Sequence, residues 1–109
     1  MIEAITGSRS RERVLVYIAA RNKAYAREIA AFYKTSLSPV QNQLNGMELA
    51  GILVSKQVGK TRVFFLNPRY AFCKELKALL EKVIEFLPEE QKTKLLNIRT
   101  RPRRQNKPY

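Results

Sequence analysis

The sequence contains no histidine, no aspartate and no tryptophan, and its only cysteine is Cys73. All nine acidic residues are therefore glutamates, so an acid–base or nucleophilic enzyme would have to work with Glu, Lys, Tyr and a single thiol. Zinc and transition-metal sites draw on several Cys or His ligands, which this chain does not supply. We therefore expect no enzymatic activity, no metal site and no bound cofactor.

Long hydrophobic runs and paired cysteines are also missing. The longest apolar run, residues 14–20, has seven residues, whereas a membrane-spanning helix needs about 20. The N-terminus lacks the basic start and apolar segment of a signal peptide. A single cysteine cannot form an intramolecular disulfide, which suits a reducing compartment. We therefore expect a cytoplasmic protein that has no membrane partner.

Positive charge is abundant and unevenly distributed along the 109 residues, whose formal net charge is +12. Residues 8–70 hold 11 Lys or Arg against three Glu, residues 71–97 hold five of each kind, and residues 98–109 hold five basic residues and no acid. The length and the hydrophobic fraction of 45% are those of one folded domain. The basic block and the basic tail indicate a polyanionic partner, and the neutral block indicates a separate task.

Periodicity and capping signals predict three helices in the basic block. The first spans about 9–21 with Ser8 or Ser10 as N-cap. The second spans about 26–33, after a short extended segment at 24–25. The third begins between residues 36 and 39 and ends near residue 50, where the glycine that follows is suited to a helix end.

Two β-type runs follow the helices, at 52–58 and 61–66. The two residues between them are Gly59 and Lys60, a pair that favours a type II′ hairpin turn. A further helix is predicted over 71–87 and a short one up to about residue 97. Three helices and a hairpin form the order of elements in a winged helix-turn-helix, so we expect a mainly α fold with a small β-hairpin wing and an additional C-terminal helix.

The third predicted helix has an outward face of uncharged polar residues. Its apolar residues Leu37, Val40 and Leu44 share one side, which leaves amides and a hydroxyl on the other. Asn and Gln side chains form paired hydrogen bonds with N6 and N7 of adenine, and Ser contacts several base edges. The face is therefore suited to reading DNA in the major groove, although the same residues also fit a plain solvent-exposed face.

The run SLSPVQNQLNGMELAGILVSKQVGKTRVFFLNP, residues 36–68, resembles the recognition helix and wing of winged helix-turn-helix transcriptional regulators of the ArsR/MarR-like kind. The shared features are Leu44, an apolar residue at position 47, the helix-to-strand junction at 50–53 and the closing pair Asn67-Pro68. Upstream, TGSRSRERVLVYI resembles the first helix of the same group. The resemblance covers about residues 6–70.

The resemblance implies roles for particular residues. Those that match the groove-facing part of the recognition helix, and would contact bases, are Ser38, Pro39, Gln41, Asn42 and Asn45. Lys60 and Arg62 match the wing and would contact the flanking minor groove or backbone. Members of the family that sense metals carry Cys and His pairs that are missing here, so metal-responsive repression is not supported.

Other basic residues in the same block are candidates for phosphate contacts, which position a protein on DNA without reading sequence. They are Arg9, Arg11, Lys23, Arg27 and Lys34. A solvated basic surface is the alternative interpretation for each of them.

The neutral block carries an apolar stripe that is wider than one hairpin-covered core requires. We expect part of it to pack on the winged domain and part on a second copy, through Phe72, Cys73, Leu76, Leu79, Leu80, Val83 and Leu87. The alternative is a monomer whose helix folds back completely. Cys73 fits a small buried hydrophobe better than a redox switch. The tail 98–109 is expected to be disordered alone, and its Arg99, Arg101, Arg103, Arg104 and Lys107 either grip phosphates or simply solubilise the chain.

These features together predict a homodimeric, sequence-specific regulator that binds double-stranded DNA and associates with the nucleoid. Residues 1–70 would form the DNA-binding domain, 71–97 the dimerisation helices and 98–109 the basic tail. Two alternatives stay open. One is a sequence-neutral architectural protein on DNA or RNA, and the other is a protein-interaction adaptor built on a winged-helix fold. The sequence names no operator and no small-molecule effector.

Overall fold

The computed structural model describes the backbone of residues 1–100 and the side chains of residues 1–96. Its elements, in chain order, are α1 (Glu3–Thr6), α2 (Arg9–Arg21), α3 (Ala26–Tyr33), α4 (Leu37–Leu49), β1 (Leu53–Val58), β2 (Thr61–Leu66), α5 (Cys73–Glu85) and α6 (Glu89–Thr100). The protein is thus mainly helical with one two-stranded antiparallel hairpin, which confirms the predicted fold class. The short helix α1 was not predicted.

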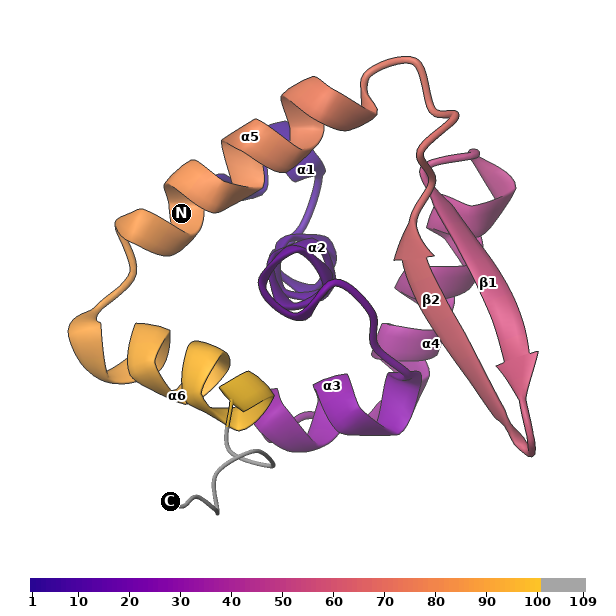
Figure 1. Ribbon diagram of the computed structural model, residues 1–109, viewed down its shortest axis with the longest axis horizontal. Helices are drawn as coiled ribbons and strands as arrows, with labels where there is room; N and C mark the ends of the chain where they lie inside the picture. The colour runs from indigo at the N-terminus through magenta and orange to yellow at the C-terminus, as the bar shows by residue number, and fades with distance from the viewer. Residues whose placement is uncertain (101–109) are drawn as a thin grey trace.

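The seven-residue apolar run forms the centre of the molecule. Figure 1 shows α2 nearly end-on, with the other helices and the hairpin arranged around it. Every residue from 14 to 20 is buried, so α2 is covered on all of its sides. The predicted cap is Ser8, whose Oγ accepts a hydrogen bond from the Arg11 backbone N–H at 3.0 Å. At the other end Asn22 takes a left-handed conformation with φ +74° and ends the helix.

Helices α3 and α4 each pack on α2 through one apolar side. Ile29 and Ala30 of α3 are buried, and so are Val40, Leu44 and Met47 of α4. Pro39 lies in the first turn of α4, where its missing N–H would have had no partner within the helix. Burial of one apolar stripe therefore turns the opposite side of α4 outward.

The hairpin pairs Leu53 with Leu66 at its base and Val58 with Thr61 at its tip. Gly59 has φ +62° and Lys60 is not among the residues with positive φ, which are the signs that a type II′ turn requires. The extended segment before α3 is confirmed, because Ala24 and Phe64 exchange backbone hydrogen bonds of 3.1 and 2.8 Å. The hairpin is thereby fastened to the loop between α2 and α3.

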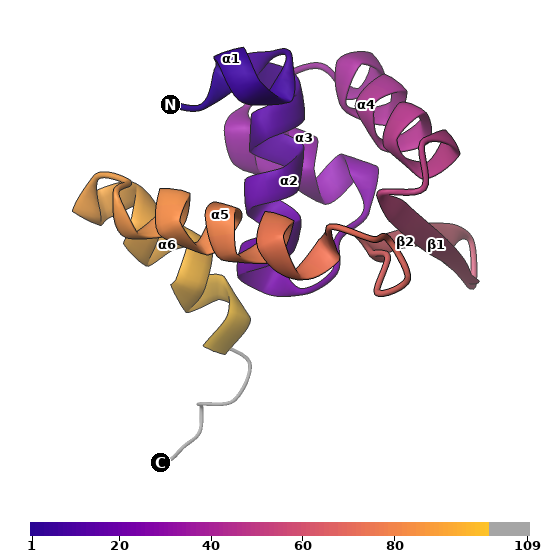
Figure 2. The same cartoon turned by 90° about the horizontal axis from the view of Figure 1, so that it is seen from above.

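The C-terminal helices share the core of the winged part. Leu80 and Val83 of α5 and Leu95 of α6 are buried in the same cluster as the apolar residues of α2. Figures 1 and 2 place α6 and the tip of the hairpin at opposite ends of the molecule. Helix α6 continues to Thr100, so the helix extends beyond the predicted boundary at residue 97. The side chain of Arg99 and residues 101–109, which hold the other basic residues of the predicted tail, lie outside the described residues.

Arg21 joins three helices at a buried point. Its Nε donates to the carbonyl oxygen of Leu95 at 3.0 Å, and its Nη1 pairs with Glu28 Oε2 at 3.2 Å. The guanidinium also lies over the Tyr17 ring, 4.4 Å from its centroid. Burial raises the pKa of the Tyr17 phenol well above its ordinary value. Arg21 therefore connects α6 directly to the start of the helix-turn-helix.

Candidate nucleic-acid interface

The outward face of α4 consists of the residues predicted to contact bases. All five are exposed, and they are Ser38, Pro39, Gln41, Asn42 and Asn45. Gly46 and Leu49 lie on the same side, and Leu49 is 91% exposed. This face is fixed by the burial of Val40, Leu44 and Met47, because those positions are spaced along the opposite side of the helix.

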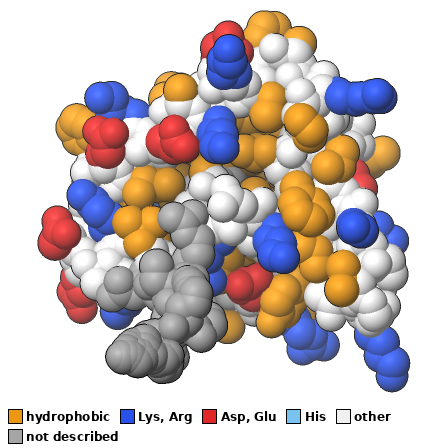
Figure 3. All heavy atoms as spheres, in the orientation of Figure 1, with side chains coloured by type: hydrophobic (Ala, Val, Ile, Leu, Met, Phe, Trp, Pro, Cys, Tyr) orange, Lys and Arg blue, Asp and Glu red, His pale blue; other side chains and the backbone are white. Residues whose placement is uncertain are grey.

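A hollow of about 310 Å³ joins this face to the hairpin and to the start of α3. Its lining comes from three parts of the chain and consists of Tyr25, Ala26, Arg27, Gln41, Leu44, Asn45, Lys60, Thr61, Arg62 and Phe64. The buried side chains of Leu44 and Phe64 form its floor. The structure thus brings two predicted base-contacting amides together with three cations predicted to contact the backbone. In Figure 3, Lys and Arg side chains gather at the end of the molecule where the hairpin turn lies.

A chain of hydrogen bonds holds the hairpin against the end of α4. Arg62 Nη1 donates to Ser55 Oγ at 2.7 Å, and the Ser55 hydroxyl donates to Glu48 Oε2 at 2.5 Å. At the base of the hairpin, Asn67 Nδ2 donates to the Gly51 carbonyl at 2.9 Å. Glu48 and Ser55 were not identified from the sequence. The available signal was the hairpin register, which puts Ser55 and Arg62 diagonally across one face.

Arg11 has a contact inside the chain that the sequence did not predict. It is partly buried, and its Nε donates to Gln43 Oε1 at 2.8 Å. The contact joins the first turn of α2 to the middle of α4. Arg11 therefore holds the orientation of α4, a role that the prediction of a simple phosphate contact did not include.

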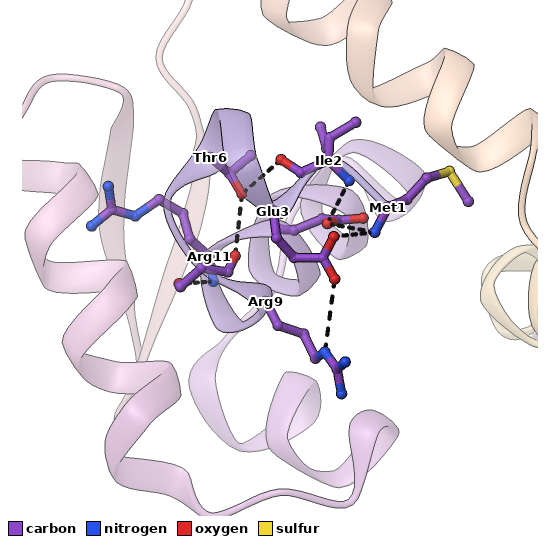
Figure 4. A network of polar contacts seen from close by, with 8 residues as sticks. Met1, Ile2, Glu3, Thr6, Arg9 and Arg11 are labelled. Atoms are coloured by element: carbon purple, nitrogen blue, oxygen red, sulfur yellow. Dashed lines mark hydrogen bonds and ion pairs between the residues drawn. The ribbon is translucent and has the colours of Figure 1, made fainter.

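Arg9 lies away from the hollow beside α4. Figure 4 shows its guanidinium directed at Glu3, with Nε 3.8 Å from Oε2. The Glu3 carboxylate also accepts a hydrogen bond from the terminal ammonium of Met1, which lowers the pKa of Glu3. Arg9 lines a second hollow, of about 280 Å³, together with Leu87 and Pro88. The prediction grouped Arg9 with the other phosphate-contact candidates, whereas the structure separates it from them.

The remaining predicted cations are exposed near the helix-turn-helix. Lys34 forms the turn between α3 and α4 with φ +56°. Lys23 precedes α3 and lines a shallow hollow with Tyr25 and Val63. Tyr25 was not identified from the sequence, although it is 41% exposed and also lines the hollow beside α4.

The residues predicted for a dimer interface fall into two groups. Phe72 is 63% exposed, and Cys73, Leu76, Leu79 and Leu87 are partly exposed. Leu80 and Val83, by contrast, are buried in the chain's own core against α2. The structure therefore assigns Leu80 and Val83 to the interior of one chain. Leu76 and Leu87 pack partly against the same core, whereas Phe72, Cys73 and Leu79 are not part of it. Phe86 is 69% exposed as well.

Within residues 1–96, no three Cys or Glu side chains lie close enough together to hold a metal ion. None of the described helices is both long and apolar enough to cross a membrane.

The fold belongs to the winged-helix class, in the arrangement seen in MarR-like proteins: α2, α3 and α4 are followed by the hairpin, and two further helices close the core. No protein-family model and no curated protein matches the sequence. Solved structures do match. YusO protein from Bacillus subtilis superposes with a TM-score of 0.56 at 17% identity, over 87% of this chain and 73% of that one. A MarR-family transcriptional regulator from Silicibacter pomeroyi superposes with a TM-score of 0.54 at 13% identity, over 92% of this chain and 73% of that one. These likenesses concern the fold alone, and the ArsR-like part of the resemblance stays a prediction.

Proposed function

We propose that this protein is a sequence-specific regulator of transcription that binds double-stranded DNA with α4 in the major groove and the hairpin on the flanking DNA. The hollow beside α4 carries the proposal, because it joins exposed amides to cations from two other elements. A helix with its side chains is about 10–12 Å across, and the major groove is about 12 Å wide. A helix that reads bases in the major groove must expose a polar face and must be held firmly by its opposite side, and α4 meets both conditions.

Two kinds of side chain divide the task at this surface. The amides of α4 would distinguish bases, while Arg27, Lys60 and Arg62 would bind phosphates and set the register of the protein on the duplex. Lys23 and Lys34 extend this basic surface on either side of α3. Each phosphate neutralised lowers the slope of log affinity against log salt by about 0.9.

We further propose that two copies associate through α5, so that residues 71–97 dimerise while 1–70 bind DNA. The exposed side chain of Phe72 and the partly exposed side chains of Cys73, Leu76, Leu79 and Leu87 support this. Five Lys and five Glu leave this block without net charge, so two copies meet without strong repulsion. A two-fold dimer would match a palindromic site. Light scattering from the purified protein distinguishes the dimer from a monomer.

The first test is recovery of fragmented genomic DNA on the purified protein, in excess non-specific competitor at near-physiological salt. Enrichment of a short palindromic motif supports a dimeric, sequence-reading regulator. Retention without a motif supports a sequence-neutral architectural or RNA-binding role instead. No retention at either low or high salt contradicts nucleic-acid binding and favours a protein-interaction adaptor.

Variants of two exposed residues test the division between reading and positioning. Lys60→Ala should make the salt slope shallower by about 0.9 for every DNA sequence, because one phosphate contact is lost. Asn42→Ala should reduce the difference between the motif and random DNA while leaving that slope unchanged. Lys94→Ala serves as the charge-matched control, since Lys94 is exposed on α6 at the opposite end of the molecule. Equal effects of Lys60→Ala and Asn42→Ala on all sequences contradict the assigned roles.

A further inference from the structure

The base-reading face of α4 carries no positive charge. Between Lys34 and Lys56 the sequence contains neither Lys nor Arg, although the chain as a whole has 21 such residues. The outward side of α4 offers a hydroxyl and three carboxamides instead. The helix that is proposed to enter the groove therefore carries no Lys or Arg side chain, although the chain as a whole is strongly basic.

The three outward amides differ from nearby amides in their hydrogen bonding. Among the described residues, the side chains of Gln41, Asn42 and Asn45 make no hydrogen bond to another protein group. Other amides nearby are occupied: Gln43 accepts from Arg11 at 2.8 Å, and Asn67 donates to Gly51 at 2.9 Å. The uncommitted amides therefore gather on the one face that would meet the bases.

Their spacing suits consecutive base pairs. Gln41 and Asn45 are separated by four residues and Asn42 and Asn45 by three, so their Cβ atoms lie about 5–6 Å apart on the helix surface. Successive bases along a strand are about 3.4 Å apart. The three amides can thus contact different bases that are next to each other or nearly so along the duplex.

Each base pair presents its own pattern in the major groove. Adenine offers the N7 acceptor and the N6 donor, which one carboxamide satisfies with its N–H and its carbonyl oxygen. Guanine offers two acceptors, N7 and O6, which are matched by the paired donors of Arg or Lys. Arg62 of the wing uses one of its donors on Ser55, at 2.7 Å. The carboxamides on the outward face of α4 thus match adenine, and that face offers no Arg or Lys to pair with guanine.

We infer that α4 reads A·T base pairs, with the carboxamides of Gln41, Asn42 and Asn45 paired to N6 and N7 of adenines in the major groove. This inference rests on the proposed DNA-binding function and goes beyond it by naming the bases that are recognised. The cations of the hollow then supply affinity for any duplex, and the amides of α4 supply the preference for A·T base pairs.

The test uses the full-length protein and the duplex recovered by selection. Each adenine is replaced in turn by 7-deazaadenine, which lacks the N7 acceptor but keeps Watson–Crick pairing. Binding is followed by fluorescence anisotropy at constant salt. At positions that α4 reads, affinity should fall about 2- to 13-fold, the range that corresponds to the loss of one hydrogen bond of the pair. Loss of affinity at no position overturns the inference.

Substitutions in the protein show which amide contacts each DNA position at which 7-deazaadenine weakens binding. In Asn42→Ala, one of the 7-deazaadenine positions should lose its effect, because the contact is already absent. Asn42→Arg should change the preferred base at that position from adenine to guanine. Gln91→Ala is the matched amide control, since Gln91 lies on α6 and should leave every position unchanged. If no single position loses its effect in Gln41→Ala, Asn42→Ala or Asn45→Ala, the assignment to these amides is wrong.

The DNA selection distinguishes a failure of the inference about A·T base pairs from a failure of the proposed DNA-binding function. A motif whose core positions are G·C pairs overturns the reading of A·T pairs while the protein remains a sequence-specific regulator. Retention of DNA without any motif overturns the proposed function and the inference together.

Discussion

Replacing Gly46 by alanine should raise the stability of the protein. Gly46 lies inside α4, and it is not among the glycines with positive φ, which are Gly7, Gly51 and Gly59. A Cβ built on it would meet nothing within 4 Å. Alanine therefore fits without strain, and the change should stabilise the helix by about 0.5–1 kcal/mol. For a domain of this size that corresponds to a rise in Tm of about 2–8 °C.

The same change should weaken DNA binding. Glycine is unfavourable in the interior of a helix, and within the described residues nothing packs against Gly46 closely enough to require it. Gly46 is exposed beside Asn45, on the face assigned to the groove. We therefore expect the missing side chain to allow the backbone of α4 to approach the DNA, so that alanine lowers affinity in a protein that has become more stable.

Circular dichroism at fixed protein concentration measures the Tm, and fluorescence anisotropy on the selected duplex measures the affinity. The matched control is Ala78→Gly, the reverse exchange at an exposed position of α5. It should lower the Tm by a similar amount without changing the intrinsic affinity for DNA. A lower Tm for Gly46→Ala would refute the account of the helix, and unchanged affinity would refute the close approach to DNA.

Three further predictions follow from contacts elsewhere in the chain. Arg21→Ala should destabilise the protein by about 3 kcal/mol in urea unfolding, because it leaves Glu28 without its buried partner. Arg21→Met removes the same ion pair and should cost nearly as much, so a methionine variant as stable as the unmodified protein would contradict the importance of the ion pair. Phe72→Lys should convert the proposed dimer to a monomer in light scattering without lowering the Tm of the monomer, since Phe72 is 63% exposed; a dimer that persists would exclude this end of α5 from the interface. Burial raises the pKa of Tyr33 to about 12, so the stabilisation that depends on the neutral phenol is complete below the ordinary value of about 10 and is lost as pH rises towards 12. Tyr33→Phe should make unfolding less sensitive to pH in that range, and an unchanged pH profile would contradict it.

Local signals were sufficient to predict most of the elements. Ser8 before an apolar run, Gly51 after one and Gly59 between two β-type runs each define a boundary by their own backbone or capping preference. These preferences act between near neighbours, so they can be read without knowing the fold. The helix α1 lacked such signals, because its N-cap residue Ile2 offers no capping side chain.

The partners of the long polar side chains could not be predicted in the same way. Arg9 and Arg11 are two residues apart in the sequence, yet one pairs with Glu3 and the other with Gln43, which is 32 residues away. The stripe on α5 poses a similar problem. Periodicity places Leu79 and Leu80 on the same helix but does not tell which of them faces α2, and only the packed structure shows that Leu80 is buried. The exposure of the residues on the outward face of α4 could be predicted, because one buried stripe is enough to determine the opposite side of a helix.

The polar groups around α4 fall into two sets according to whether they have partners inside the chain. Arg11 holds its middle through Gln43, and the hydrogen bonds from Arg62 through Ser55 to Glu48 hold its end. Because these contacts come from α2 and from the hairpin, α4 is constrained from two directions before any DNA arrives. A helix that is already held in place loses less conformational freedom on binding, so more of the energy of each contact made by its side chains remains as affinity. The amides without partners in the described part of the chain can therefore act as readers, because the amides and guanidiniums that do have partners keep the helix in place.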